Sequence, residues 1–150
     1  MESKEFKKIV SEVLLQNGFT IKHRKYCLED DSLIVFINFQ KSNFSNSYYI
    51  NYYFMIKSLH SKIQKLVIKD KDFEGRIHHY TLSGKTSGDF NLDEVYHEDI
   101  KYSIQKGIDK KIKPTFNEGI VNYLNSRPIV KMMSSKATKK YLEEQTKYLD

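Results

Sequence analysis

The chain has 150 residues, of which 39% are hydrophobic and 29% are charged, and its formal net charge at pH 7 is +6. This length and apolar content are enough to bury a core without disulfides or metals, which excludes a disordered chain and predicts a single domain over residues 1–150. The positive excess is confined to residues 101–150, which carry 11 Lys and Arg against 5 Asp and Glu.

The first predicted element is an amphipathic helix over residues 3–17. Its apolar residues repeat at helical spacing and form one stripe: Phe6, Ile9, Val10, Val13 and Leu14. Ser3 is placed to cap the start, and Gly18 is placed to end the helix in a left-handed conformation. Phe19 then stands where a closing hydrophobic contact is expected.

Alternation of apolar and polar residues after the helix predicts an antiparallel sheet of about four strands. The expected strands cover residues 19–28, with an interruption by the basic stretch 22–25, and then residues 33–40, 48–57 and 73–82. The second and third strands carry apolar residues on both faces, so we expect them to be central. Residues 59–71 fit a short helix or a further strand equally well.

Helical patterns occupy most of the last third of the chain. Apolar residues at intervals of four predict a helix from a capping-box-like start at residues 91–94 to Pro114. A second helix restarts at Thr115, Pro128 interrupts the chain again, and residues 135–149 form a last helix. The predicted fold is therefore α+β, with an N-terminal helix, an antiparallel sheet of about four strands and a helical C-terminal third.

Three short stretches, residues 15–19 (LQNGF), 36–42 (FINFQKS) and 48–52 (YYINY), resemble the bacterial domain of unknown function 4304 family. Arg76, on a later strand, fits the same pattern. The resemblance extends over roughly residues 5–125 and implies a helix that leads into an antiparallel sheet. The family has no established activity, so the resemblance implies a fold and no function.

Several common catalytic patterns are incomplete. Residues 84–86 (GKT) match the end of a phosphate-binding loop, but His79 stands where that motif requires Gly. Adjacent His78 and His79 point to opposite faces of a strand, so they do not chelate a metal together. On one strand, Cys27 and His23 would lie about 13 Å apart, so a small buried thiol is the better interpretation of Cys27. We therefore expect no catalytic residue, no metal site and no cofactor.

One set of polar side chains recurs on matching faces of the predicted strands. Its six members are Asn38, Gln40, Asn51, Tyr53, Arg76 and His78. If the strands pair in register, an arginine and several amides gather on one side of the sheet, where they can bind an anion or a partner's side chain. The alternative is a solvated or helix-covered face whose polar groups satisfy one another.

The leading functional hypothesis is a non-catalytic protein-binding module, such as an immunity-type or accessory protein. The first alternative is a nucleic-acid-binding protein that uses the basic C-terminal third, although only three residues of the chain are Arg. The second is a small-ligand site at the Arg76 sheet face. We expect a monomer or a weak homodimer.

The sequence also predicts a cytoplasmic protein without membrane association. Residues 1–8 mix both charge signs, unlike a signal peptide, and a single cysteine does not form an internal disulfide. The longest aliphatic and aromatic run, residues 33–37, is far below the roughly 20 residues that span a bilayer.

Overall fold

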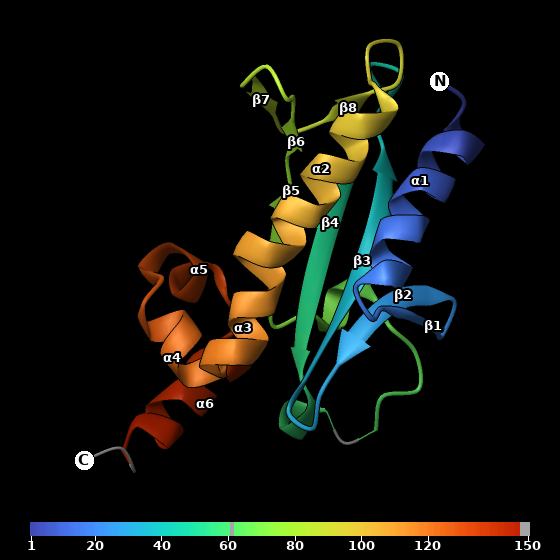
Figure 1. Ribbon diagram of the computed structural model, residues 1–150. Coiled ribbons are helices and arrows are strands. Elements are labelled where there is room, and N and C mark those ends of the chain that lie inside the picture. The colour runs from blue at the N-terminus through green and yellow to red at the C-terminus, as the bar shows by residue number, and fades with distance from the viewer. Residues whose placement is uncertain (61, 148–150) are drawn as a thin grey trace.

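The computed structural model describes residues 1–60 and 62–147 and has a mixed α+β architecture (Figure 1). Its main sheet is antiparallel and has six strands among the described residues, in the order β1-β2-β3-β4-β5, with β8 also paired to β4. These strands are β1 (Thr20–Lys22), β2 (Lys25–Glu29), β3 (Leu33–Lys41), β4 (Ser47–Ile56), β5 (Phe73–Ile77) and β8 (Phe90–Asn91). Two further strands, β6 (His79–Tyr80) and β7 (Thr86–Ser87), form a small separate sheet.

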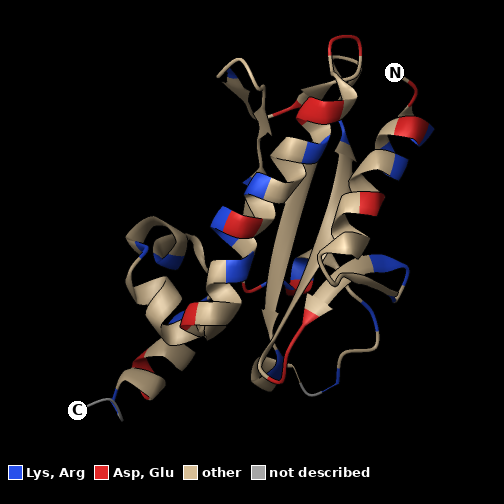
Figure 2. Ribbon diagram, viewed as in Figure 1, with Lys and Arg blue, Asp and Glu red and all other residues tan. Residues whose placement is uncertain are grey.

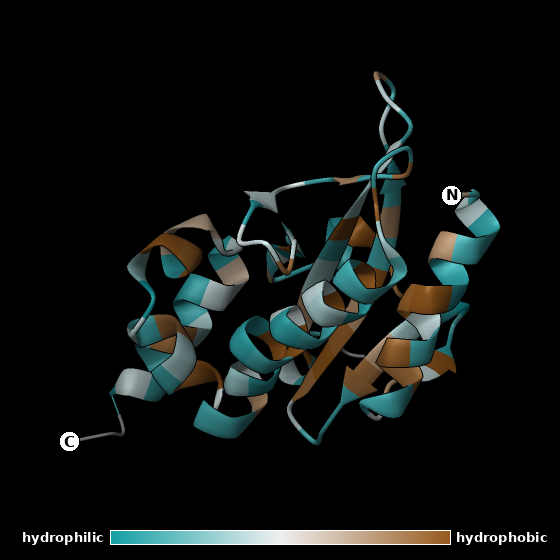
Figure 3. Ribbon diagram, turned by 45° about the horizontal axis from the view of Figure 1, so that its top comes forward, coloured by the Kyte–Doolittle hydropathy of each residue, from teal (hydrophilic) through white to brown (hydrophobic). Residues whose placement is uncertain are grey.

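The N-terminal helix and the helix that follows β8 cover one face of the main sheet, and the C-terminal helices gather beside its β5 edge (Figures 1 and 3). The helical elements are α1 (Ser3–Gln16), α2 (His97–Gly107), the π-helical turn η3 (Ile108–Ile112), α3 (Lys113–Glu118), α4 (Ile120–Asn125), α5 (Pro128–Met133) and α6 (Lys136–Thr146). The N-terminal helix, antiparallel sheet and helical C-terminal third that the sequence predicts are therefore confirmed. None of the helices in the described ranges is both long and apolar enough to cross a bilayer.

Helix α1 ends as its sequence predicts. Gly18 has φ +89°, and the Phe19 amide donates to the Leu14 carbonyl at 3.1 Å, which closes the helix with a left-handed glycine and buries Phe19. The predicted cap is wrong, because Ser3 is already the first helical residue and Glu2 occupies the cap position without a side-chain hydrogen bond.

The single strand predicted over residues 19–28 is instead a hairpin of β1 and β2. His23 and Arg24 have φ values of 52° and 64°, so the chain reverses within these two residues, and Lys22 pairs with Lys25. Tight hairpins of this kind usually carry Asn or Gly at the left-handed positions. His23 and Arg24 lack this signature, so the sequence pattern did not indicate a turn here.

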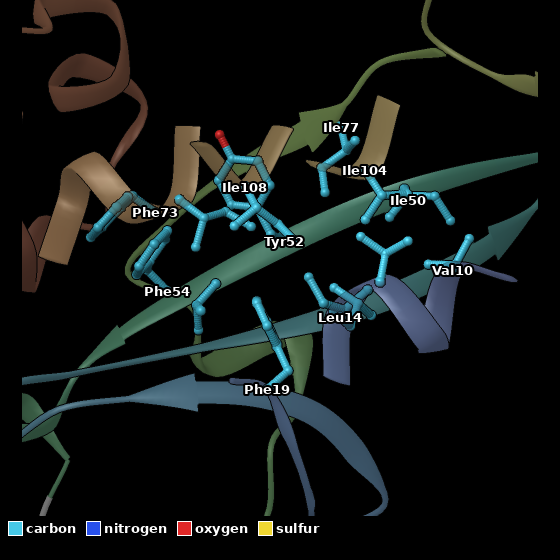
Figure 4. Close-up of a cluster of buried hydrophobic side chains, with 14 of the residues drawn as sticks. Val10, Leu14, Phe19, Ile50, Tyr52, Phe54, Phe73, Ile77, Ile104 and Ile108 are labelled. Atoms are coloured by element: carbon cyan, nitrogen blue, oxygen red, sulfur yellow. The ribbon is translucent and has the colours of Figure 1, made fainter. Parts of the chain in front are cut away.

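Strands β3 and β4 are central, as predicted, and their observed bounds differ from the predicted ones by one residue at most. One face packs against α1 and α2 to form the main core, in which Val10, Leu14, Ile104 and Ile108 point toward β4 (Figure 4). The opposite face holds a smaller buried cluster at one end of the sheet, made of Cys27, Ile34, Phe36, Tyr53, Met55 and Leu66. The interpretation of Cys27 as a buried thiol is confirmed, since it is 1% exposed.

The described residues of the segment between β4 and β5 form neither the helix nor the strand that the sequence allowed. It contains two short 3₁₀ turns, Lys57–Leu59 and Ile68–Asp70. Leu66 is buried in the smaller cluster and Ile63 packs against it, so this segment covers one end of the sheet face opposite α1 and α2. The other end of that face carries no such cover among the described residues.

The strand predicted over residues 73–82 is split at His78. The Tyr80 amide donates to Ser103 Oγ of α2 at 2.7 Å, and the Leu82 amide donates to Asp99 Oδ1 at 3.0 Å. Polar side chains of the helix thus take hydrogen bonds that a neighbouring strand would otherwise supply. The chain leaves the main sheet after Ile77 to reach them.

The predicted helix over residues 91–113 starts later and does not end at Pro114. Residue Asn91 belongs to β8 and accepts the Asp93 amide through Oδ1 at 3.0 Å, so this segment is a turn, and α2 begins at His97. The helical path continues through η3 into α3, where Pro114 occupies the first turn and its missing N–H is not needed. It ends at Gly119, which has φ +81°.

The last helix is largely as predicted. The Ser135 side chain caps α6 by accepting the Thr138 amide at 3.0 Å, and Leu142 is buried. Residues 148 and 149, at the end of the predicted helix, lie outside the described residues.

Candidate binding site on the open sheet face

The six polar residues predicted to share a sheet face come from β3, β4 and the end of β5. Strand register places Asn38 opposite Asn51 and Asn51 opposite Arg76, and Gln40 follows Asn38 on the same face of β3. We call the side chains of Gln40, Asn51 and Arg76 the row. This row lies on the face opposite α1 and α2, next to the end that Ile63 and Leu66 cover. We call the uncovered part of this face the open sheet face.

Hydrogen bonds join three of the predicted residues directly. Asn51 is 5% exposed, and its Oδ1 accepts Arg76 Nε at 2.9 Å. On its other side, Asn51 Nδ2 donates to Gln40 Oε1 at 2.8 Å. The buried amide is therefore satisfied by two neighbours that both reach toward solvent.

The guanidinium of Arg76 contacts an aromatic ring. Its central carbon lies 4.2 Å from the centroid of the Tyr49 ring, within the range of cation–π contact. Tyr49 lies directly opposite Gln40 in the pairing of β3 with β4. The strand register therefore fixes the position of Tyr49 next to the row. Among the described residues, no carboxylate forms an ion pair with Arg76.

A cavity of about 520 Å³ lies over this row. Its lining residues are Gln40, Asn51, Tyr53, Lys71, Glu74, Gly75, Arg76 and His78. Five of the six predicted residues thus line one cavity, whereas Asn38 faces Asn51 but does not line it. Tyr53 also belongs to the small buried cluster and packs against Phe36, with ring centroids 5.4 Å apart.

Lys111 supports the site from the π-helical turn. Its Nζ donates to the Arg76 carbonyl at 2.8 Å and lies 3.2 Å from His78 Nδ1. Burial lowers the pKa of Lys111, and burial lowers the pKa of His78 too, with further contributions from the charges of Lys111 and Arg76. His78 is consequently neutral near pH 7.

The depressed pKa of His78 gives a titration prediction. In Lys111→Met we expect the His78 pKa to rise toward its ordinary value, because one of the repelling charges is gone. Lys110→Met, on the exposed side of the same turn, makes the same change in net charge and should leave it unchanged. NMR titration of the His78 ring protons measures both, and equal His78 pKa values in the two variants would contradict the assigned contact.

The lowered pKa of His78 also makes the stability of the folded protein depend on pH. A histidine whose folded pKa lies below its unfolded value binds protons more readily when unfolded, so its contribution is complete above the unfolded pKa, about 6.5. That contribution is lost as the pH falls from there through the folded pKa of His78.

Four residues of the site were missed from the sequence: Tyr49, Lys71, Glu74 and Lys111. Tyr49 and Glu74 have the same strand parity as Asn51 and Arg76, so alternation alone was enough to find them. Lys71 pairs with Glu74 at 2.8 Å at the start of β5. Lys111 had no such signal, because its contact with His78 depends on the π-helical turn.

The other sequence candidates are not assembled into sites. Across the described ranges, no group of three or more His, Cys, Asp or Glu side chains is placed to hold a metal ion. Lys and Arg occur on α1 and the β1–β2 hairpin as well as in the last third (Figure 2). In that third, Lys131, Lys139 and Lys147 line a cavity of about 1000 Å³ that α5 and α6 help to form.

The fold and the site together define an α+β domain with a polar, uncovered sheet face centred on an arginine. The family model described as Domain of unknown function (DUF4304) matches residues 10–118, and the chain therefore belongs to this family. The match spans β1 to β8 and includes all six residues predicted for the site. Neither the curated proteins nor the solved structures contain a match to the chain.

Proposed function

We propose that the chain is a non-catalytic protein-binding module, of the immunity or accessory type, that binds its partner through the open sheet face. The observation that carries the proposal is the row of Gln40, Asn51 and Arg76, which is already ordered by hydrogen bonds while Arg76 has no carboxylate partner among the described residues. An ordered arginine loses little freedom on binding, which favours affinity.

The composition of the face supports a protein partner over a small molecule. Arginine and tyrosine dominate the energetics of protein interfaces, and Arg76 is stacked on Tyr49 at the centre of this face. Small-molecule sites are usually concave and mostly apolar, whereas amides and charged groups line most of this cavity. The row consists of amides and a guanidinium, which do not change their protonation state near neutral pH, so the proposal assigns no catalytic step.

The proposal also assigns the protein to the cytoplasm of a bacterium. The buried, unpaired Cys27 suits a reducing compartment. Residence there gives the open sheet face access to soluble partners.

Affinity capture tests the proposed function. A tagged protein, incubated with nuclease-treated lysate of its source organism, should retain one protein in stoichiometric amount, and cross-links should join that protein to β3, β4 or β5. Arg76→Ala should abolish retention, whereas Lys8→Ala, exposed on α1 at the opposite face, should not. Retention by Arg76→Ala equal to that of the unmodified protein would contradict the proposal, provided circular dichroism shows both to be folded.

A nucleic-acid-binding function is the second candidate, and one observation favours it. Lys131, Lys139 and Lys147 converge on the cavity that α5 and α6 help to form. Binding of this kind weakens steeply with salt because counterions are released from the phosphates. No binding of single- or double-stranded DNA or RNA at low salt would remove this candidate.

A further inference from the structure

We propose that the open sheet face is a carboxylate-binding site, which takes an Asp or Glu side chain of a partner protein onto Arg76, with Gln40 and His78 as flanking donors. The inference rests on the proposed function and adds the chemistry of the partner. It follows from the direction of the hydrogen bonds in the row, from the neutral state of His78 and from the charges around the cavity.

Arg76 sets the direction of every hydrogen bond in the row. A guanidinium only donates, so Asn51 must present its oxygen to Arg76 Nε, as observed at 2.9 Å. The Asn51 amide nitrogen then faces the other way and donates to Gln40 Oε1. This contact turns the Gln40 amide nitrogen outward, and within the described residues neither that nitrogen nor the Arg76 Nη atoms form a hydrogen bond. Both ends of the row therefore present donors.

Lys111 determines in the same way which nitrogen of His78 accepts a hydrogen bond. An ammonium also only donates, so His78 Nδ1, at 3.2 Å from Lys111 Nζ, must be the acceptor. A neutral imidazole with an accepting Nδ1 carries its proton on Nε2. His78 lines the same cavity as Arg76 and Gln40, so its donor joins theirs.

The charges around the cavity favour a carboxylate over a phosphate group. Lys71 is neutralised by Glu74 at 2.8 Å, and His78 is neutral, which leaves Arg76 as the one unbalanced charge among the lining residues. Lys111 is not a lining residue, and its ammonium is directed to the Arg76 carbonyl and to His78 Nδ1. A single positive charge matches a monoanion. The planar fork of the guanidinium fits the two oxygens of a carboxylate, and the guanidinium contacts the Tyr49 ring at 4.2 Å.

NMR titration with sodium acetate against sodium chloride at constant ionic strength tests the inference. In the unmodified protein we expect saturable shifts of the Gln40 side-chain amide and the Arg76 Nε–H resonances, with a dissociation constant of about 10 mM. Gln40→Glu keeps the oxygen that Asn51 needs but replaces the outward donor by a negative charge, so acetate binding should weaken at least about tenfold. Gln16→Glu, exposed on α1, makes the same charge change and should bind acetate normally.

Two results would overturn the inference: absence of saturable acetate shifts at these two side chains, or inorganic phosphate binding more than about tenfold tighter than acetate at neutral pH. The outcome is separable from that of the proposed function. If acetate fails to bind while capture of a partner still depends on Arg76, the proposed carboxylate-binding site is contradicted and the proposed protein-binding function is retained. If acetate binds as expected but no protein is captured, the proposed protein-binding function is contradicted and the anion-binding site is retained.

Discussion

Asp72→Ala should lower the free energy of unfolding by about 3–5 kcal/mol. The Asp72 side chain is 4% exposed and accepts the Ile56 amide at 2.7 Å, His60 Nε2 at 3.0 Å and Ser135 Oγ at 3.2 Å. These donors belong to the end of β4, to the segment that covers the smaller cluster, and to the cap of α6. Truncation leaves the buried Ile56 amide without a partner and releases three parts of the fold at once.

Urea unfolding of Asp72→Ala beside Asp70→Ala measures this effect. Asp70 is two residues away, and its side chain forms no hydrogen bond or ion pair with any described residue, so its truncation should change stability by less than about 0.5 kcal/mol. Asp72→Asn retains one acceptor oxygen and should fall between the two. Equal unfolding midpoints for the two alanine variants would show that Asp72 does not hold these elements together.

Gly75→Ala should destabilise the protein by about 2–4 kcal/mol. A Cβ at this position would stand 2.0 Å from Tyr52 Oη and 2.2 Å from Cζ of the same ring, and Tyr52 is only 5% exposed. The ring pairs directly across from Gly75 on β4 and packs edge-on against Phe54, with centroids 5.9 Å apart. It therefore cannot move aside without disturbing the main core.

Gly88→Ala is the matched control for this substitution. Its added Cβ would meet nothing nearer than Arg76 Nη1 at 3.9 Å, which is an ordinary contact. Thermal unfolding should thus separate the two variants by several degrees for a domain of this size. If Gly75→Ala unfolds at the same temperature as Gly88→Ala, the close packing of β5 against Tyr52 is not as described.

Much of the fold and part of the site were predictable from local patterns. The alternation on β3 and β4 placed both strands to within one residue and put Gln40 and Asn51 on one face. The family resemblance singled out the same two strands and Arg76. These predictions succeeded because strand parity depends only on neighbouring residues.

The remaining features depend on contacts between segments distant in the sequence. Strand β5 ends before His78 because side chains of α2 accept hydrogen bonds from the backbone amides of Tyr80 and Leu82. Lys111 reaches His78 only because a π-helical turn replaces the helix end predicted at Pro114. The reversal at His23 and Arg24 was missed for a different reason, since neither residue type is typical of a left-handed turn.

The sequence also did not predict that the polar face of the sheet is uncovered. Alternation does not say whether a helix lies over a given sheet face, and both outcomes fitted the pattern. The structure places α1 and α2 over the apolar face (Figures 1 and 3). Arg76 and Gln40 line a cavity on the other face. The binding role proposed for this face rests on that arrangement rather than on any motif.

The most direct test of the account is the affinity of the captured partner, measured by isothermal titration calorimetry with the unmodified protein, Arg76→Gln and Lys8→Gln. If the open sheet face is the binding surface and Arg76 its centre, Arg76→Gln should raise the dissociation constant at least about 30-fold. Lys8→Gln, which makes the same charge change on α1, should alter it by less than about twofold. Equal affinities for Arg76→Gln and the unmodified protein would contradict the account.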